Sequence, residues 1–378
     1  MGRAGRLAAG AAPWVRQISP YQPGKPVEEL EREYGIADAI KLASNENPLG
    51  PPPAALAAIR NAAASVALYP DGSGHYLRQA LARELGLAAE QLVLGNGSND
   101  VLVLLAEAFL TPGDEAVYSE YAFLVYPLAV QATGARARVA PALPAEHPEQ
   151  PLGHDPEALA DCVSDKTRLL FIANPNNPTG SWLDAAALQG LLDCVPETTL
   201  VVVDEAYAEY VAQPGYPPSV DWLERYPNLV ITRTFSKAYG LAGLRIGYAI
   251  AGAEVCELLN RIRQPFNTST VAQAAALAAL GERAFLRRSR ELNAAGLRQL
   301  GEGLAELGFR PLPSAGNFLL VDLGEPALPW YEALLRDGII VRPVGNYGLP
   351  NHLRITVGLP DQNERLLASL AARRRRAR

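Results

Sequence analysis

Short apolar runs alternate with segments of helical periodicity from about residue 90 to residue 250, and this alternation constrains the fold more than any other feature of the chain. The expected strands are Gln91–Leu94, Glu115–Ser119, Leu169–Ala173, Leu200–Val203, Leu229–Thr232 and Arg245–Ile250. The expected helices among them are Asn99–Leu110, Phe123–Ala132 and Leu183–Cys194. Alternating strands and helices predict an α/β domain on a mostly parallel sheet flanked by helices.

The pattern changes after Ala251, where longer helical segments come first and short strands follow. The expected helices are Glu254–Arg263, Val271–Leu280 and Glu282–Leu307, and the later short elements are Phe318–Asp322, Tyr331–Arg336, Ile339–Arg342 and Leu353–Val357. We therefore predict a smaller α+β domain at the C-terminus. The predicted division is an N-terminal arm over 1–40, a large domain over 41–265 and a small domain over 266–378.

Composition excludes several classes of function. A net charge of -6 does not favour a nucleic-acid partner, and no apolar run approaches the roughly 18 residues of a membrane span. Three scattered cysteines and four scattered histidines predict neither disulfides nor a metal site. A cytoplasmic setting is expected. The arginine run that begins at Arg373 is either a solvated helix end or an interaction tail.

The segment Thr234–Arg245 has the strongest chemical signal, because it places Lys237 among small, hydroxyl and glycine residues just after a predicted strand. Open α/β sheets bind ligands at the carboxyl ends of their strands. A lysine that is desolvated there loses basicity and becomes a nucleophile for Schiff-base chemistry. Ser236 and Arg245 could bind a phosphate. The alternative is an ordinary exposed loop lysine.

Two carboxylates, Asp204 and Glu205, end the apolar strand that includes Val201–Val203. A buried carboxylate is costly unless it is paired, and a protonated pyridine nitrogen is one cation that would pair with Asp204. A solvated strand end is an equally open interpretation of this segment. Metal ligation is a further alternative, but no GxxxxGK[ST] loop accompanies the acids.

Two glycine- and asparagine-rich turns follow other predicted strands. Leu94–Asp100 leads into a predicted helix, whose first backbone N–H groups could bind an anion. Asn174–Gly180 could supply an amide to a ring hydroxyl. Taken separately, each is also consistent with an ordinary helix cap or turn.

Together and in this order, the four segments resemble those of fold-type I aminotransferases that depend on pyridoxal 5′-phosphate (PLP). Within that family the chain is most similar to histidinol-phosphate aminotransferases. The segments that narrow the resemblance are Ser19–Pro26, Ile40–Gly50, Gly345–Pro350 and His352–Gly358. The resemblance extends from about Ser19 to the last helix.

The resemblance implies a role for each matching residue around the cofactor. Lys237 would hold PLP as a Schiff base and move the proton, and Asp204 would pair with the pyridine nitrogen. Tyr207 and Asn177 would bind the ring 3′-oxygen. The residues implied to surround the phosphate are Gly97, Ser98, Asn99, Thr234, Ser236 and Arg245. Phe123 would stack on the ring, with Tyr121 as its rival.

The resemblance also implies the substrate contacts and the assembly. Arg354 and Arg342 would bind anionic groups of the substrate, and Tyr21 on the arm would close over it. Tyr69 would reach the phosphate in a partner subunit, so the enzyme would be a homodimer with shared active sites. The small-molecule partners would be an amino donor and a keto acceptor.

The expected reaction is transamination between histidinol phosphate and 2-oxoglutarate in histidine biosynthesis. The nearest alternative is an aromatic amino-acid aminotransferase that acts on phenylalanine or tyrosine. More distant alternatives are a phosphothreonine decarboxylase and a non-catalytic PLP-binding protein.

Overall fold

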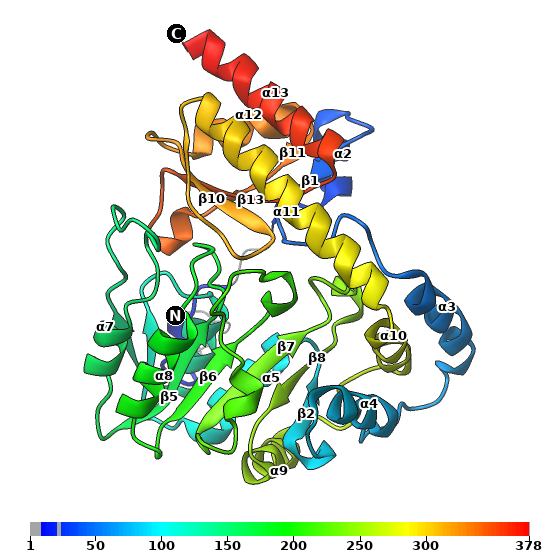
Figure 1. Cartoon of the computed structure of the whole chain (residues 1–378), viewed down its shortest axis with the longest axis vertical. Coiled ribbons are helices and arrows are strands. Elements are labelled where there is room, and N and C mark those ends of the chain that lie inside the picture. The colour runs from blue at the N-terminus through cyan, green and yellow to red at the C-terminus, as the bar shows by residue number, and fades with distance from the viewer. Residues whose placement is uncertain (1–8, 21–23, 378) are drawn as a thin grey trace.

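The computed structural model of the chain describes residues 9–20 and 24–377, and its centre is a seven-stranded sheet (Figure 1). The strands follow the order β2-β8-β7-β6-β5-β3-β4. Their bounds are β2 Leu92–Gly95, β3 Glu115–Ser119, β4 Arg136–Ala140, β5 Thr167–Ala173, β6 Leu200–Asp204, β7 Leu229–Thr234 and β8 Gly247–Ile250. The five strands from β7 to β4 are parallel, so the prediction of a mostly parallel α/β sheet is confirmed.

Alternate residues of the central strands enter two separate hydrophobic cores, as the two-residue period of a strand requires. Val201 and Val203 of β6 pack into one core, and Val202 packs into the other. The first core includes side chains of α4 (His75–Leu85), α8 (Ala185–Cys194) and α10 (Thr270–Leu280). The second includes α5 (Ser98–Phe109), α6 (Val125–Thr133) and α9 (Ala253–Ile262). Helices therefore cover both faces of the sheet, and each central strand contains a run of apolar residues that is buried on both sides.

Two features of the sheet differ from expectation. The edge strand β4 was not predicted, because alternating arginines in Arg136–Ala140 give it a largely exposed surface in place of an apolar run. The strand predicted over Arg245–Ile250 begins only at Gly247 and is antiparallel to both neighbours. Arg245 has φ 54, which is left-handed backbone that no strand residue adopts.

A second layer of structure lies above the large sheet and is built on a four-stranded antiparallel sheet of order β12-β13-β10-β9 (Figure 1). Its strands are β9 Arg310–Pro311, β10 Phe318–Asp322, β12 Arg342–Pro343 and β13 His352–Thr356. The helices α11 (Arg283–Glu306), α12 (Leu328–Arg336) and α13 (Pro360–Ala377) share its hydrophobic core. A short parallel pair joins β1 (Ile40–Lys41) to β11 (Ile339–Ile340).

The predicted domain boundaries stay predictions. Helix α10 contributes Ala272 and Ala276 to the core of the large sheet, although it lies beyond residue 265. Leu42, just after β1, packs in the core of the smaller sheet instead. The packing of α10 and that of Leu42 both show that the chain passes between the two layers more than once.

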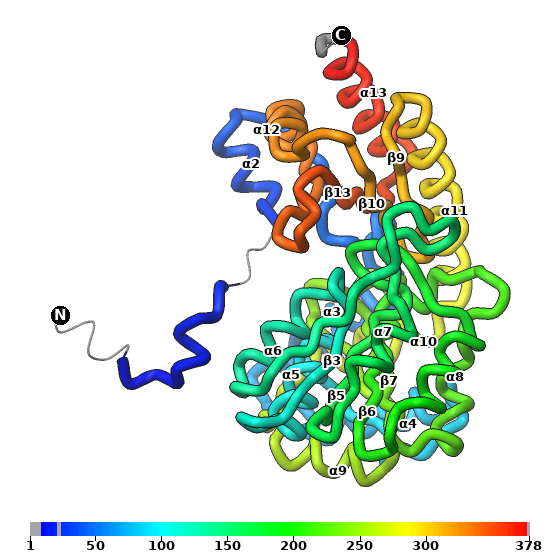
Figure 2. Tube along the Cα trace, turned by 90° about the vertical axis from the view of Figure 1, so that its left-hand side faces the viewer, coloured from blue at the N-terminus to red at the C-terminus, as the bar shows by residue number. Residues whose placement is uncertain are grey.

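Residues 9–20 project from one side of the molecule (Figure 2). Trp14 donates a hydrogen bond from Nε1 to the carbonyl oxygen of Ala132, and its ring covers Gly134 after α6. Farther along, α2 (Val27–Tyr34) places Leu30 against Ile340. Two further helices pack on helices already described: α3 (Pro53–Ala62) on α10, and α7 (Pro156–Asp161) on α8.

The described part of the C-terminal arginine run lies on α13. The guanidinium of Arg373 lies 5.0 Å from the centre of the Trp330 ring, and that of Arg374 lies 5.0 Å from the centre of Phe309. Both contacts combine charge with aromatic packing. Within residues 9–20 and 24–377, no helix is long and apolar enough to cross a membrane.

Two glycines of α11 provide a test of how tightly the small sheet is packed. A Cβ at Gly296 would lie 2.3 Å from Cγ1 of Val357, whereas a Cβ at Gly301 would meet no atom within 4 Å. Gly296→Ala should therefore lower the free energy of unfolding by about 1–3 kcal/mol through overpacking. Gly301→Ala should raise it by about 0.5–1 kcal/mol through helix propensity. Urea unfolding followed by circular dichroism measures both, and equal effects would contradict the packing.

Candidate active site

A cavity of about 310 Å³ lies where β5, β6 and β7 end at the carboxyl edge of the large sheet, beneath the smaller sheet. Residues from the large sheet's loops form one wall, and residues of the segment after β1 and of the small sheet form the other. The side chains named from the sequence that line it are Ser98, Asn99, Phe123, Asn177, Asp204, Tyr207, Thr234, Ser236, Lys237, Arg245, Arg342 and Arg354. Positions spread over more than 250 residues of sequence thus meet in one cavity.

Four other sequence predictions fall elsewhere. Gly97 precedes α5 and touches the cavity residue Arg245. Tyr121 packs beside Leu152 and outside the cavity lining, so Phe123 is the one of the two rival aromatics that lines it. Tyr69 is 81% exposed and outside the lining. Tyr21 lies outside the described residues.

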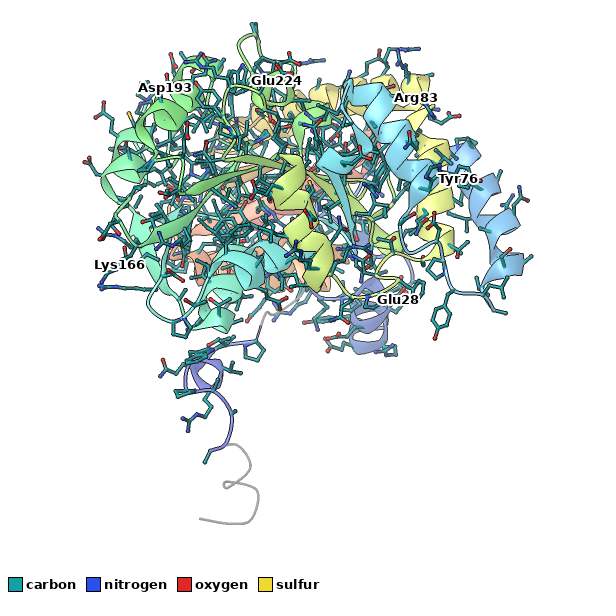
Figure 3. All side chains as sticks on the ribbon, turned by 90° about the horizontal axis from the view of Figure 1, so that it is seen from below. Glu28, Tyr76, Arg83, Lys166, Asp193 and Glu224 are labelled. Atoms are coloured by element: carbon teal, nitrogen blue, oxygen red, sulfur yellow. The ribbon has the colours of Figure 1, made fainter. Side chains whose placement is uncertain are left out.

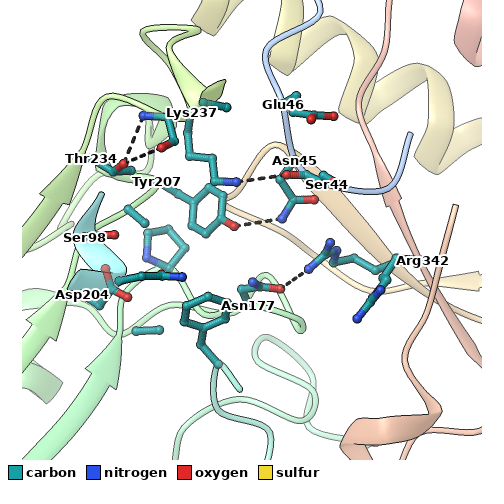
Figure 4. A pocket seen from close by; sticks show the side chains of 18 of the residues that line it. Ser44, Asn45, Glu46, Ser98, Asn177, Asp204, Tyr207, Thr234, Lys237 and Arg342 are labelled. Atoms are coloured by element: carbon teal, nitrogen blue, oxygen red, sulfur yellow. Dashed lines mark hydrogen bonds between the residues drawn. The ribbon is translucent and has the colours of Figure 1, made fainter. Parts of the chain in front are cut away.

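Lys237 follows β7 in a loop that turns its side chain into the cavity (Figure 4). Its Nζ donates a hydrogen bond to the carbonyl oxygen of Ser44, 3.0 Å away. Burial lowers the pKa of the Lys237 amine to about 7, and the positive charges of Arg354 and Arg245 act in the same direction. A substantial fraction of the amine is therefore neutral and nucleophilic near neutral pH.

Asp204 ends β6 and points into the cavity, whereas Glu205 points to the other side of the chain. Glu205 is fully buried and forms an ion pair with Arg233, with 2.6 Å between Oε2 and Nη2. Asp204 instead accepts hydrogen bonds from the Thr232 hydroxyl at 2.9 Å and the Tyr126 hydroxyl at 3.0 Å. Burial raises the pKa of Asp204 to about 6, and the two hydroxyl donors oppose this rise. A cation at the cavity side of Asp204 would stabilise its carboxylate further.

Hydrogen-bond donors gather at the end of the cavity where α5 begins. Gly97 caps α5 with φ 82, and a Cβ there would lie 2.3 Å from Nη2 of Arg245. Only glycine lets that guanidinium lie over the helix N-terminus. Nη1 of Arg245 donates to the Ser236 hydroxyl, which also receives a hydrogen bond from Thr234. A helix N-terminus, an arginine and hydroxyls form a donor set suited to phosphate.

Two arginines face each other on the opposite wall. Arg342 of β12 and Arg354 of β13 are direct partners in the antiparallel register, so both side chains project from the same face of the small sheet. Like charges directly across a sheet repel, and an anion between them would relieve the repulsion. Nη1 of Arg354 also donates to Oδ1 of Asn177 at 2.6 Å.

Several lining residues were not assigned roles from the sequence. Ser44, Asn45 and Glu46 come from the segment after β1, and Tyr347 precedes β13. The segment Ile40–Gly50 was noted for its resemblance, but only the fold shows that it forms a wall of this cavity. Tyr126, whose hydroxyl donates to Asp204 from behind the lining, was also given no role from the sequence.

Comparison with known proteins agrees with this geometry. The family model described as aminotransferase class I and II matches residues 37–370. The chain belongs to this family. Members of the aminotransferase class I and II family use PLP, and the fold class predicted from the sequence, fold-type I, is confirmed by its structural neighbours.

Curated relatives within the family share about half of their residues with the chain. Histidinol-phosphate aminotransferase 2 of Methylococcus capsulatus is 54% identical over 360 residues, which cover 95% of this chain and 97% of that protein. Histidinol-phosphate aminotransferase 2 of Pseudomonas aeruginosa is 52% identical over 362 residues, which cover 95% and 96%.

Solved structures are similar over almost the whole chain. The histidinol-phosphate aminotransferase of Sinorhizobium meliloti in complex with pyridoxal-5′-phosphate has a TM-score of 0.88 at 33% identity, covering 98% of this chain and 99% of that one. The aspartate aminotransferase of Thermus thermophilus with maleate has a TM-score of 0.82 at 26% identity, covering 97% and 99%.

The cavity lining fits PLP. A nucleophilic amine, Lys237, suits the aldehyde, and the donors around Arg245 suit the phosphate. Asp204 is a buried carboxylate, and its two hydrogen-bond donors are uncharged hydroxyls. A protonated ring nitrogen would balance its negative charge. Within residues 9–20 and 24–377, no group of three His, Cys, Asp or Glu residues could hold a metal ion.

The chain has only four lysines, Lys25, Lys41, Lys166 and Lys237, which makes the pKa of Lys237 measurable. After reductive methylation of the cofactor-free protein with ¹³C-formaldehyde, one lysine signal should titrate near pH 7 by NMR, because burial lowers the pKa of Lys237. That signal should vanish in Lys237→Arg. A spectrum in which no lysine signal titrates near pH 7 would contradict the burial of this amine.

Proposed function

We propose that this chain catalyses PLP-dependent transamination between histidinol phosphate and 2-oxoglutarate. The observation that carries the substrate assignment is the pair Arg342 and Arg354, which lie in direct register and line the same cavity as Lys237. A doubly charged phosphate between two guanidinium groups balances their repulsion. The names of the relatives from M. capsulatus and P. aeruginosa agree with this substrate.

The proposed cofactor contacts follow from the chemistry of the lining. Asp204 pairs with the ring nitrogen, Phe123 stacks on the ring, and Tyr207 and Asn177 bind the 3′-oxygen. The Tyr207 phenol is suited to donate, because burial raises its pKa to about 12 and keeps it protonated. The residues proposed to hold the phosphate are Gly97, Ser98, Asn99, Thr234, Ser236 and Arg245.

Bound PLP supplies an electron sink that stabilises negative charge at the substrate Cα. The protein moves the proton. The neutral Lys237 amine would accept the proton from the substrate Cα as a general base and, once protonated, would serve as the general acid. A pKa of about 7 suits both steps, since neither protonation state is strongly preferred near neutral pH. Arg342 and Arg354 orient the substrate through its anionic group, and Arg354 is held by its hydrogen bond to Asn177. The small sheet above the cavity limits the access of water.

A homodimer with shared active sites is part of the proposal. Tyr69 is 81% exposed and stacks on Phe266 with 4.7 Å between ring centres. Leu68 and Tyr76 are also exposed nearby in sequence, and Tyr76 lies at the rim of the molecule (Figure 3). Exposed aromatic and aliphatic side chains of this kind support a protein contact, in which Tyr69 would reach the phosphate in the partner's cavity. The cytoplasmic location stays a prediction from the sequence.

A panel of amino donors with 2-oxoglutarate tests the substrate. We expect kcat/KM for histidinol phosphate to exceed that for phenylalanine by about 100-fold or more, because two guanidinium groups favour a doubly charged phosphate over the singly charged carboxylate of phenylalanine. Glutamate formation is the measurement. Arg342→Gln should lower kcat/KM for histidinol phosphate more than for phenylalanine. A wild-type protein that prefers phenylalanine would instead be an aromatic amino-acid aminotransferase.

Mixing two inactive variants tests the shared sites. Lys237→Ala removes the amine, and Tyr69→Ala removes the side chain proposed to serve the partner. Each variant alone should have little activity. Co-expressed with different affinity tags, they should recover about a quarter of wild-type activity, since half of randomly formed dimers carry one intact site. No recovery in isolated hybrid dimers would show that Tyr69 serves its own subunit.

A further inference from the structure

We infer that Asn45, held by Thr356, is a positioning residue that fixes Tyr207 as a hydrogen-bond donor toward the cavity. Asn45 follows β1 and is 1% exposed, with a left-handed backbone at φ 55. Its Nδ2 donates to the Tyr207 hydroxyl oxygen at 2.9 Å (Figure 4). The inference deepens the proposed function and rests on it, because the acceptor for Tyr207 is the proposed 3′-oxygen of PLP.

Thr356 determines which way the Asn45 amide points. The backbone N–H of Asn45 donates to the Thr356 hydroxyl oxygen at 3.0 Å, and that hydroxyl donates its single proton to Oδ1 of Asn45 at 3.0 Å. Oδ1 is thereby held toward β13, and Nδ2 is left facing Tyr207. Asn317 donates to the Asn45 carbonyl oxygen at 3.1 Å and so restrains the backbone as well.

The direction of this chain of hydrogen bonds sets the role of Tyr207. A phenol has one proton, and a phenol oxygen that already accepts from Asn45 directs that proton elsewhere. Tyr207 lines the cavity and packs edge-on against Phe318. Its hydroxyl proton can therefore form a hydrogen bond to an acceptor in the cavity. The charged and titratable groups around it are Arg354, Asp204, Lys237 and Tyr347. If the amide were reversed, Tyr207 would donate to Asn45 and be lost as a donor to the ligand.

The left-handed backbone explains why an asparagine suits this position. Among residues with a side chain, asparagine and aspartate tolerate positive φ best. Only asparagine also provides a donor and an acceptor on one short planar group. Asn45→Asp therefore keeps the size and backbone preference of the residue but replaces the donor to Tyr207 with an acceptor.

The test compares Asn45→Asp, Thr356→Val and Thr356→Ser as PLP-loaded proteins. The readout is the pH at which the visible absorption of the bound cofactor changes. The Tyr207 hydroxyl, as a donor to the anionic ring oxygen, stabilises the deprotonated form of the bound cofactor. Loss of this donor should therefore raise the pH of the absorption change by about one unit in Asn45→Asp and Thr356→Val. Thr356→Ser keeps the hydroxyl and should match the wild type. In the first two variants kcat/KM should also fall about tenfold.

A double variant and a matched control separate positioning from general damage. In a Tyr207→Phe background, Asn45→Asp should add no further spectral shift. Asn47→Asp introduces the same buried carboxylate two residues later, where the side chain contacts Ala238 and Ser289 in place of Tyr207. It should leave the transition pH unchanged even if unfolding by urea becomes easier. If Asn45→Asp does not fold, the Thr356→Val and Thr356→Ser pair carries the test alone.

Two results would overturn the inference. One is an unchanged transition pH in both Asn45→Asp and Thr356→Val, while the wild type binds PLP and turns over histidinol phosphate. The other is an equal spectral shift from Asn45→Asp with and without Tyr207. A wild-type protein that binds PLP but does not transaminate would count against the proposed function, whereas its spectral titration would still test the role of Asn45.

Discussion

Burial of ionisable groups around one cavity is the constraint on which the rest of the site depends. The same loss of water lowers the pKa of Lys237 to about 7 and raises that of Asp204 to about 6. Neither shift would occur on a loop exposed to solvent. The pKa values of both groups therefore depend on their position at the strand ends and on the small sheet that lies above them. The hydroxyls of Tyr126 and Thr232 moderate the shift at Asp204 and hold its carboxylate in one orientation.

The cavity depends equally on the two layers of the molecule. The large sheet contributes the amine, the acid and the donors at the start of α5. The small sheet contributes Arg342 and Arg354, whose antiparallel register brings two positive charges together. Asn45 joins the layers, because it bonds Thr356 of the small sheet on one side and Tyr207 of the large unit on the other. A movement of the small sheet would thus be transmitted to the residues that surround the cofactor position.

The parts of the fold that were predicted are those with strong local periodicity. The central strands β5, β6 and β7 each contain a continuous run of apolar residues because helices cover both faces of the sheet, and such runs are visible in sequence. The edge strand β4 is largely exposed and carries two arginines, so it has no apolar run, and its pairing with β3 is decided by its neighbour. Likewise, the antiparallel direction of β8 cannot be recognised from hydrophobicity alone.

The candidate site divides in the same way. Lys237, Asp204, Asn177 and Ser98 each follow a recognisable strand, so their motifs could be identified in isolation. The wall formed by Ser44 and Asn45 could not be derived from local pattern, because it exists only where the chain after β1 returns to face the large sheet. Phe123 and Tyr121 were indistinguishable as flat aromatic residues, and the path of the chain into α6 directs only Phe123 into the cavity.

By itself, the sequence determined the order of the strands and helices with strong periodicity, the residues at the ends of those strands and the family to which the chain belongs, because these depend on local periodicity and short motifs. Tertiary structure alone decided which of those residues share a cavity, how far burial shifts their pKa values and which way the Asn45 amide points. The physical reason is that desolvation and hydrogen-bond direction depend on atoms distant in sequence, such as those of Thr356 and Tyr207 around Asn45.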